Sequence, residues 1–391
     1  MTPFDPHAAA YSKDPYPFYA QARELTPVLQ VQPYGSWWVF RHDDVRQVLL
    51  DTEGFTKANP LQDHLPDPPM DALANLGPGV FMMDPPRHDV VRPLLDGLFK
   101  DAIAGIDRVV ERQARQLLDD TRGSARFEFV QAFARPLPAQ VLFQVMGMPD
   151  ATRALSGWVD GYIAGHDPTA PLGARLGALT CTFALQAYFL AQAQGGPACP
   201  HAGLFKGMLD SVDTQGLSRN EVATSALNLA IAGYASTTYL LATGLYRLLT
   251  NPDQLAALRA DPGLALNAVW EMLRYDAPAQ LVDRFAARDV TLGGVKIRRG
   301  DAVTAVIGSA NRDERVWKDA DRFDIRRDTQ GQIGFGDGIH RCLGAPLVHQ
   351  VAPTALKVLL GEFPVLSLAG QPQWQTDPYL RSVANLPVAT A

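Results

Sequence analysis

The sequence predicts a mainly α-helical protein with small β-sheets. Long stretches at 101–120, 172–193 and 218–250 carry the spacing or end signals typical of helices. Short runs rich in β-branched and aromatic residues, such as 28–31 and 37–40, are bounded by Gly and Pro turns. A chain of 391 residues that is 47% hydrophobic and 19% charged can bury a large core.

Composition excludes several classes of protein. A net charge of −6 gives no sign of nucleic-acid binding. The three cysteines, Cys181, Cys199 and Cys342, form no CxxC pair, and an odd number argues against a disulfide framework. Residues 1–11 contain no apolar run, so we expect neither a signal peptide nor a membrane anchor. These features predict a cytoplasmic protein that does not bind membranes.

The N-terminal part is expected to be rich in strands. A short helix at 17–25 starts with proline, and the runs 28–31 and 37–40 flank Pro33-Tyr34-Gly35 as the strands of a hairpin. A further helix is expected at 43–50. Residues 55–80 are proline-rich and weakly periodic, and their Leu, Met and Phe content indicates a functional loop that covers an apolar surface.

The middle of the chain is predicted to be helical. Its expected helices are 101–120, 137–146, 150–162 and 172–193, with a Gly/Pro-rich loop at 195–203. Ser218 and Glu221 form a capping box that starts the longest helix, which runs to about residue 250 and spans roughly 45 Å. Because this helix is apolar on most faces, we expect it to be central and buried. Later elements are strands at 295–297 and 302–307 and a helix at 345–360.

The segment 335–344 (FGDGIHRCLG) places one cysteine in a glycine-rich turn. Gly336 and Gly338 allow backbone conformations that other residues avoid. Cys342 is expected just before a helix N-terminus, where N–H groups and the helix dipole favour a thiolate. A rigid thiolate beside Phe335 meets the needs of an axial ligand to haem iron. The alternative is a buried structural cysteine.

Six positions of this segment, Phe335, Gly336, Gly338, His340, Cys342 and Gly344, match the pattern F-G-x-G-x-H-x-C-x-G. The segment resembles the haem-binding signature of the cytochromes P-450. The resemblance implies the P-450 fold, a triangular helical prism around a buried haem b, with Cys342 as the iron ligand. It also implies a single domain over 1–391, with a β-rich part at about 1–60 and a helical haem-binding core at about 84–360.

Other residues acquire roles from the same resemblance. His88 and Arg92 lie four residues apart on one helix face and are similar to the family's H-x-x-x-R, which holds a haem propionate. Without the resemblance they would be interpreted as a solvated surface pair. Further haem contacts are expected from Arg284 and His340, which are candidate propionate partners, and from Phe335, Gly336, Gly344 and Ala232.

The middle of the longest helix resembles the family's A-G-x-acid-Thr segment, which receives dioxygen. Ala235 stands where the family usually has Asp or Glu, and Ser236 where it usually has Thr; Thr237 follows. Serine keeps a hydroxyl, whereas alanine cannot relay a proton. A substrate group, an ordered water chain or Tyr234 must then supply protons. The expected pocket consists of Asn228, Ile231, Ala232, Ala235, Phe81, Met82 and Val282. Asn228 could orient a polar substrate or form a helix-packing hydrogen bond.

Glu271 and Arg274 resemble the family's E-x-x-R, which pairs with an arginine in a later segment. Arg322 is the matching arginine. We expect a buried charge network among these three residues, costly to break one member at a time.

The resemblance therefore predicts a haem-thiolate monooxygenase that acts on a small organic substrate. A ferredoxin and its reductase would supply electrons, because the haem fold uses up the chain, and a monomer is expected. Two alternatives remain open. One is an atypical haem-thiolate enzyme, driven by peroxide, coupling aromatic rings or reducing nitric oxide, because Ala235 lacks the acid. The other is a haem sensor without turnover, against which Ser236 argues.

Overall fold

The computed structural model describes residues 5–61, 79–167, 170–195, 202–212 and 214–390. Helices account for 55% of the structure and the sheets are small, which confirms the predicted fold class. The chain divides into two compact units. The first consists of 1–56, 107–137 and 236–391, and the second of 57–106 and 138–235. Whether the whole chain acts as one domain, with the predicted β-rich and helical parts, stays a prediction.

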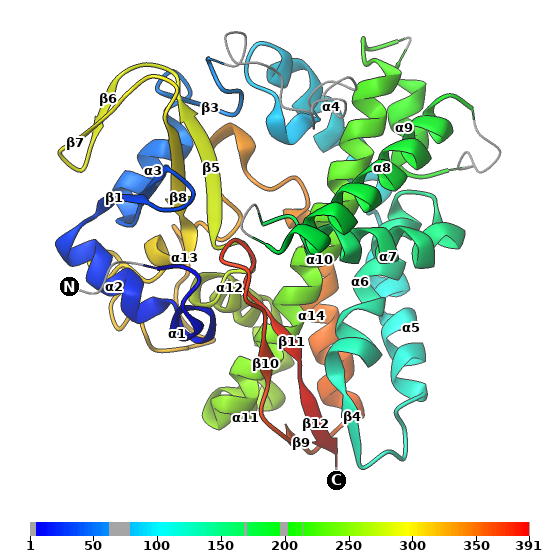
Figure 1. Ribbon diagram of the computed structural model, residues 1–391. Helices are drawn as coiled ribbons and strands as arrows, with labels where there is room; N and C mark the ends of the chain where they lie inside the picture. The colour runs from blue at the N-terminus through cyan, green and yellow to red at the C-terminus, as the bar shows by residue number, and fades with distance from the viewer. Residues whose placement is uncertain (1–4, 62–78, 168–169, 196–201, 213, 391) are drawn as a thin grey trace. The chain divides into compact units, whose positions relative to one another are not determined.

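The first unit contains a five-stranded sheet in the order β1-β2-β8-β5-β3 (Figure 1). Its strands are β1 (Val28–Val31), β2 (Ser36–Val39), β8 (Ala302–Val306), β5 (Leu281–Ala286) and β3 (Phe55–Thr56). Strands β1 and β2 form the predicted antiparallel hairpin, whereas β2 and β8 are parallel. Strands separated by more than 200 residues are therefore neighbours, which hydrophobic patterning alone does not reveal.

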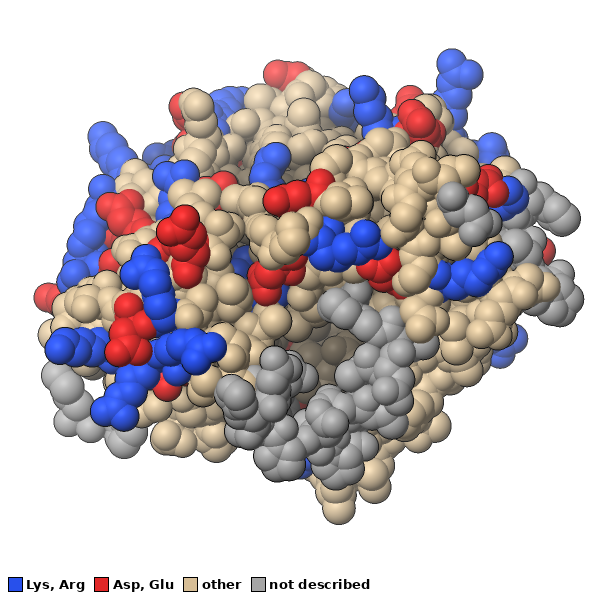
Figure 2. Space-filling view, turned by 90° about the horizontal axis from the view of Figure 1, so that it is seen from above, with Lys and Arg blue, Asp and Glu red and all other residues tan. Residues whose placement is uncertain are grey.

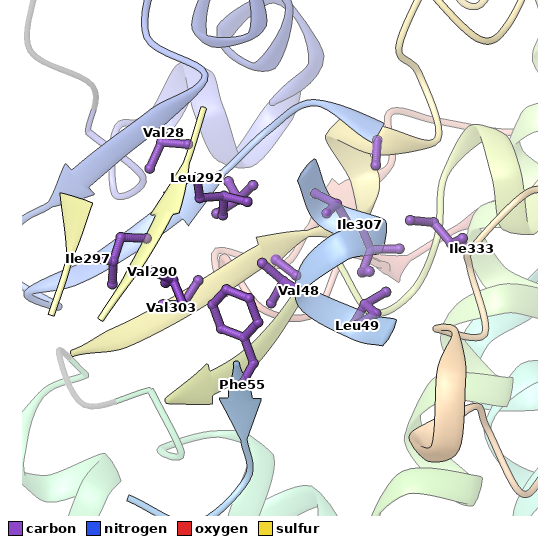
Figure 3. Close-up of a cluster of buried hydrophobic side chains, with 14 of the residues drawn as sticks. Val28, Val48, Leu49, Phe55, Val290, Leu292, Ile297, Val303, Ile307 and Ile333 are labelled. Atoms are coloured by element: carbon purple, nitrogen blue, oxygen red, sulfur yellow. The ribbon is translucent and has the colours of Figure 1, made fainter. Parts of the chain in front are cut away.

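A buried apolar cluster joins this sheet to helix α3 (His42–Leu50) (Figure 3). The side chains of Val48 and Leu49 point into the same cluster as Phe55 and Ile307, which come from β3 and α13 (Ile307–Ala310). The spacing of the buried positions His42, Val45, Val48 and Leu49 along α3 is that of a helix with one apolar face. This packing fixes α3 beside the segment that carries Cys342.

The remaining elements of the first unit surround this core. The predicted helices at 17–25 and 345–360 are confirmed as α2 and α14. The helices are α1 (Ala9–Lys13), α2 (Tyr16–Leu25), most of α5 (Ile106–Asp119), α11 (Pro252–Ala260), α12 (Ala265–Tyr275) and α14 (Ala345–Glu362). The smaller sheets are β4-β12-β9 (Arg126–Glu128, Pro387–Thr390, Leu366–Leu368), β6-β7 (Val290–Leu292, Val295–Ile297) and β10-β11 (Gln373–Trp374, Val383–Asn385).

The second unit is helical. It contains η3 (Val80–Met82), α4 (Arg87–Ala102), most of α6 (Pro136–Val145), α7 (Thr152–Ile163), α8 (Leu172–Ala193) and α9 (Leu204–Asp210). Helices α7 and α8 lie side by side (Figure 1). Glycines let them approach closely, because a Cβ atom at Gly161 would lie 2.3 Å from Sγ of Cys181. Most of the loop predicted at 55–80, and part of that at 195–203 with Cys199, lies outside the described residues.

Helix α10 (Arg219–Thr250) is continuous, and its residues up to Ala235 belong to the second unit and the others to the first. The predicted capping box is confirmed. The backbone N–H of Glu221 donates to Oγ of Ser218 at 3.1 Å, and the N–H of Ser218 donates to Oε2 of Glu221 at 2.8 Å. Two of the donors that a helix start leaves without intrahelical partners are thereby satisfied.

The prediction of a single helix over 101–120 is wrong at its start. Helix α4 ends at Ala102 and α5 begins at Ile106. Gly105, at φ +70°, lies in the turn between them, a left-handed conformation that glycine adopts without strain. The apolar stripe continues across the turn, and for this reason periodicity alone missed the break.

Helix α8 is the one helix among the described residues that is long and apolar enough to cross a membrane. A single helix of this kind is weak evidence for a membrane span. Acidic and basic side chains are interspersed on the face shown in Figure 2.

Candidate functional site

The cysteine segment is a tight turn in front of helix α14. The backbone N–H of Cys342 donates to the carbonyl of Phe335 at 2.8 Å, which closes the loop between them. Gly336 and Gly338 both have φ +69°, a region that disfavours other side chains. A Cβ atom at Gly338 would lie 2.6 Å from the carbonyl oxygen of Leu49, so glycine is also required there by space. The sequence predicted this arrangement.

Helix α3 holds the loop from the outside. Asp337 accepts a hydrogen bond from the N–H of Gly338 at 2.9 Å, and its other oxygen lies 2.9 Å from Nε of Arg46. The loop then passes through the short helix η7 (Gly338–His340) to Gly344, the N-cap of α14. Cys342 therefore lies next to the N-terminus of an 18-residue helix.

The surroundings of Cys342 fit a metal-binding thiolate. Cys342 is half-buried, and it forms no disulfide. A Cβ atom at Gly344 would lie 3.7 Å from Sγ, so glycine keeps the space beside the sulfur open. A soft thiolate next to a helix N-terminus, with room around it, suits the iron of a haem.

Three other candidates in this unit lie on strand β5 and helix η7. Arg284 is buried, 3% exposed, and its Nη1 donates to the carbonyl of Asp283 at 2.9 Å. Val282, on the same strand, is half-buried, and so is His340 in η7. A buried guanidinium needs anionic or carbonyl partners, as a propionate-binding arginine does.

Glu271 and Arg274 form a completely buried ion pair, each with a side chain 0% exposed. Nε and Nη2 of Arg274 donate to the two carboxylate oxygens of Glu271 at 2.7 and 2.8 Å. Nη1 of Arg274 donates to the carbonyls of Asn311 and Ala320 at 2.9 and 3.0 Å. The predicted buried network exists and fixes the backbone of 311–324 against α12.

The third member of this network was predicted wrongly. The side chain of Arg322 is 64% exposed and lies 3.9 Å from Asp324. Arg327 takes the place instead, with Nε 3.3 Å from Oε1 of Glu271 and a side chain 13% exposed. Arg322 contributes its backbone carbonyl, which accepts from Arg274 and Arg327. The loop turns the side chain of Arg322 outward, and its position in the sequence does not show this.

In the second unit, α4 places His88 and Arg92 on one face. His88 is buried, 3% exposed, and Nδ1 lies 3.5 Å from Asp89. Nε of Arg92 lies 3.0 and 3.1 Å from the oxygens of Asp96, one turn further along. His88 is therefore no solvated surface residue, which removes the alternative interpretation for it.

The start of α4 is tied to the start of α10. Arg87 donates from Nε and Nη2 to the two oxygens of Glu221, both at 2.6 Å, and from Nη2 to the carbonyl of Gly216 at 2.8 Å. Sequence analysis recognised Glu221 as a capping residue but missed this second partner. The two residues lie 134 positions apart, and no local pattern in the sequence pairs them.

Most of helix α10 is buried, but one of its faces forms a partly exposed stripe. Ala232 is exposed, and Asn228, Ile231 and Ser236 are half-buried. Ala235 and Thr237 are buried, 4% and 6% exposed, so their predicted places at a site stay predictions. The stripe has the spacing i, i+4, i+8 of one helix face.

Helix η3 lies near this part of α10. A Cβ atom at Gly79 would lie 2.1 Å from Nδ2 of Asn228, so the amide packs against the residue before η3. Met82 is 48% exposed and Phe81 is half-buried. Both alternatives for Asn228, orienting a substrate and forming a helix-packing hydrogen bond, stay predictions.

Tyr234 donates a hydrogen bond to the carboxylate of Asp160 on α7, at 3.0 Å. Tyr234 is buried, 3% exposed, and directly precedes Ala235. Sequence analysis named Tyr234 but gave no signal for Asp160, which lies far away in sequence. A carboxylate on α7 thus contacts the residue that directly precedes Ala235.

Comparison with known proteins identifies the family. The profile of the Cytochrome P-450 family matches residues 263–388. The 6-deoxyerythronolide B hydroxylase of Saccharopolyspora erythraea is 33% identical to this chain over 98% of each protein. The chain belongs to the cytochrome P-450 family. The cytochrome P-450 monooxygenase PikC of Streptomyces venezuelae is 34% identical and covers 97% of this chain and 91% of its own length.

A solved structure also shows the fold of the family. Cytochrome P-450 CYP109Q5 from Chondromyces apiculatus superposes with a TM-score of 0.88 at 32% identity, covering 99% of this chain and 98% of its own. The chain has the P-450 fold and is an oxidoreductase of the P-450 monooxygenase family. Membership implies a haem with a cysteine thiolate ligand, small-molecule substrates and redox partners.

Proposed function

We propose that this P-450 hydroxylates a small organic molecule with O₂, with Cys342 as the thiolate ligand of a haem b. The observation that supports this most strongly is the cysteine loop. It places a half-buried sulfur next to the N-terminus of α14, and the N–H of Cys342 is fixed to Phe335. When bound, the haem supplies oxygen activation, to which thiolate ligation contributes electron density.

The cationic and donor side chains have the task of holding the haem's carboxylates. We assign His88 and Arg92 on α4, and Arg284 and His340 in the first unit, to the propionates. Asp96 fixes the direction of Arg92, and the ion pair between Arg87 and Glu221 fixes the first turn of α4. Phe335, Gly336, Gly344 and Ala232 are assigned to contacts with the flat faces of the group.

The distal chemistry is assigned to α10. Ser236 keeps the hydroxyl that donates a hydrogen bond near the reacting oxygen. Ala235 cannot hold a proton there, so we assign proton supply to the pair formed by Tyr234 and Asp160, with the catalytic role of Thr237 open to the same tests. Support comes from the 3.0 Å hydrogen bond between a buried phenol and a carboxylate. Substrate contacts are assigned to Asn228, Ile231, Ala232, Ala235, Phe81, Met82 and Val282.

Electrons are proposed to come from a ferredoxin and its reductase in the cytoplasm, and the working unit is proposed to be a monomer. The relatives named hydroxylase and monooxygenase support turnover rather than a haem sensor. The peroxide-driven, ring-coupling and nitric-oxide-reducing alternatives rest only on the missing acid at position 235, for which Asp160 offers a substitute.

Turnover under three sets of conditions tests this function. A ligand screen by Soret shift on the purified protein first finds a molecule that binds. Product is then measured with ferredoxin, reductase, NAD(P)H and O₂, with peroxide alone, and with NADH alone. We expect product in the first mixture, with one oxygen atom derived from ¹⁸O₂. Product only in the second or third mixture would refute the monooxygenase assignment.

A further inference from the structure

Three aromatic rings from three elements meet beneath the cysteine loop. Trp270 belongs to α12, His349 to α14, and Phe335 to the loop itself. The ring centroids of Trp270 and His349 lie 4.4 Å apart, those of Trp270 and Phe335 5.5 Å, and those of Phe335 and His349 5.6 Å. Each ring contacts both others, so none can move without displacing its neighbours.

This cluster is connected to Cys342 through one residue. Phe335 contributes its ring to the cluster and its carbonyl to the 2.8 Å hydrogen bond from the N–H of Cys342. A shift of the Phe335 ring therefore changes the backbone that carries the sulfur. On the far side, Trp270 directly precedes Glu271, whose buried pair with Arg274 fixes α12. Trp270 thus lies on a helix held by a buried ion pair and forms one wall of the cluster.

The uncharged ring of His349 lies between Trp270 of α12 and Phe335 of the cysteine loop. It is half-buried, and its Nε2 is buried without a hydrogen-bond partner among the described residues. Burial lowers the pKa of His349, and the positive charge of Arg341 lowers it further. A protonated imidazole here would leave an unsatisfied N–H beside another cation. The site therefore uses the shape of the histidine ring and not its charge.

We propose that His349 is a positioning residue for the sulfur ligand: its ring, held against Trp270, sets the position of Phe335 and through it the backbone of Cys342. This inference rests on the proposed role of Cys342 in binding haem. A fixed backbone keeps N–H donors directed at the sulfur, and such donors tune the reduction potential of a thiolate-bound iron. His349 would then influence the haem without contacting it.

The test compares His349→Ala, which removes the ring, with His349→Phe, which keeps a ring at this position. Both are purified as holoproteins. Two quantities are measured that do not require turnover: the midpoint potential and the lifetime of the thiolate-type Soret band of the carbon monoxide complex. We expect His349→Ala to shift the potential and to lose the band several-fold faster, and His349→Phe to restore both to near wild-type values.

A matched control separates positioning from general stability. Phe363 follows α14 at its other end and pairs with Phe127, with ring centroids 5.5 Å apart. Phe363→Leu should lower the melting temperature without changing the potential or the band. If His349→Ala does not yield a folded holoprotein, Trp270→Phe takes its place. This change puts a smaller ring beside His349, and it should shift the midpoint potential and shorten the lifetime of the Soret band in the same way.

The possible outcomes separate the positioning role of His349 from the proposed role of Cys342 in binding haem. Wild-type protein without a thiolate-type band would refute the role of Cys342. A normal wild-type band together with wild-type behaviour of His349→Ala, or of Trp270→Phe in its place, would refute only the positioning role. Equal spectral effects of Phe363→Leu and His349→Ala would also refute it, because the effect would then be one of general stability.

Discussion

Arg274 and Glu271 share two hydrogen bonds, of 2.7 and 2.8 Å, inside the protein with no exposed surface on either side chain. The pair also fixes distant backbone, because Arg274 donates to the carbonyls of Asn311 and Ala320. A buried pair of this kind is costly to break: without Arg274, Glu271 would keep only Arg327 at 3.3 Å and the N–H of Asp324 at 2.9 Å as partners.

Replacing Arg274 by Ala should lower the free energy of unfolding by about 3–5 kcal/mol, because the buried carboxylate of Glu271 would lose both hydrogen bonds from Arg274 and the carbonyls of Asn311 and Ala320 would lose their donor. Denaturant titration measures this loss. Arg322→Ala is the control, since that side chain is 64% exposed, and it should change stability by no more than about 0.5 kcal/mol. Arg327→Ala should fall between the two. A loss for Arg322→Ala as large as that for Arg274→Ala would contradict the geometry of the network.

Replacing Gly161 by Ala should force α7 and α8 apart, because the new methyl group would lie 2.3 Å from Sγ of Cys181. Overpacking of this kind costs about 1–3 kcal/mol. Thermal unfolding measures the loss. Gly157→Ala, on the same helix with nothing within 4 Å of the new atom, should be neutral or slightly stabilising.

A double variant sharpens the Gly161 prediction. Cys181→Ala removes the sulfur and leaves Cβ at 3.5 Å, an ordinary contact distance. Gly161→Ala combined with Cys181→Ala should therefore recover most of the lost stability, with a coupling energy of about 1 kcal/mol or more. Strictly additive losses would show that the sulfur is not the obstacle.

Replacing Asp160 by Asn, or Tyr234 by Phe, should reduce the fraction of electrons that reach product, because each change removes part of the proposed proton supply. Ser236→Ala should increase peroxide release for the same reason. Each effect is expected to be about tenfold or more on coupled turnover, as is typical for a lost acid–base group. Product and peroxide are measured per NAD(P)H consumed. Unchanged coupling in all three variants would assign the proton to the substrate.

Asp276 should make stability depend on acid pH. Burial works to raise the pKa of this carboxyl, but the charges of Arg247 and Arg381 and the hydrogen bond from Tyr16 outweigh it, so the pKa lies well below its usual value. The stabilisation is therefore complete above the unfolded-state pKa of about 3.9 and is lost as the pH falls toward the folded-state pKa.

Asp276→Asn tests this relationship. The variant should be less stable at pH 7 by about 3–5 kcal/mol, because the buried Arg381 and the half-buried Arg247 lose their anion. Its unfolding free energy should also change less than that of the wild type between pH 5 and pH 3, as followed by denaturant titration at each pH. Parallel pH profiles would show that Asp276 does not carry the acid sensitivity.

Local signals in the sequence predicted the parts of the structure that depend on neighbouring residues. The capping box at Ser218 and Glu221 marked the start of α10, and the glycines at 336 and 338 marked the turn before α14. The turn at Gly105 was missed, since the apolar stripe continues through it.

Long-range partners could not be predicted from spacing. Arg327 rather than Arg322 reaches Glu271, because the fold of the loop decides which side chain points inward. The contact of Tyr234 with Asp160 and that of Trp270 with His349 each join helices far apart in the sequence. Such pairs depend on tertiary packing, and neither residue carries a local signal for its partner.

The bond between Cys342 and a haem iron is the central claim, and the spectrum of the reduced protein under carbon monoxide tests it most directly. We predict a Soret band near 450 nm, as thiolate ligation gives, and the loss of that band in Cys342→Ala. Wild-type protein that binds no haem, or a Cys342→Ala variant that keeps the same band, would contradict the account.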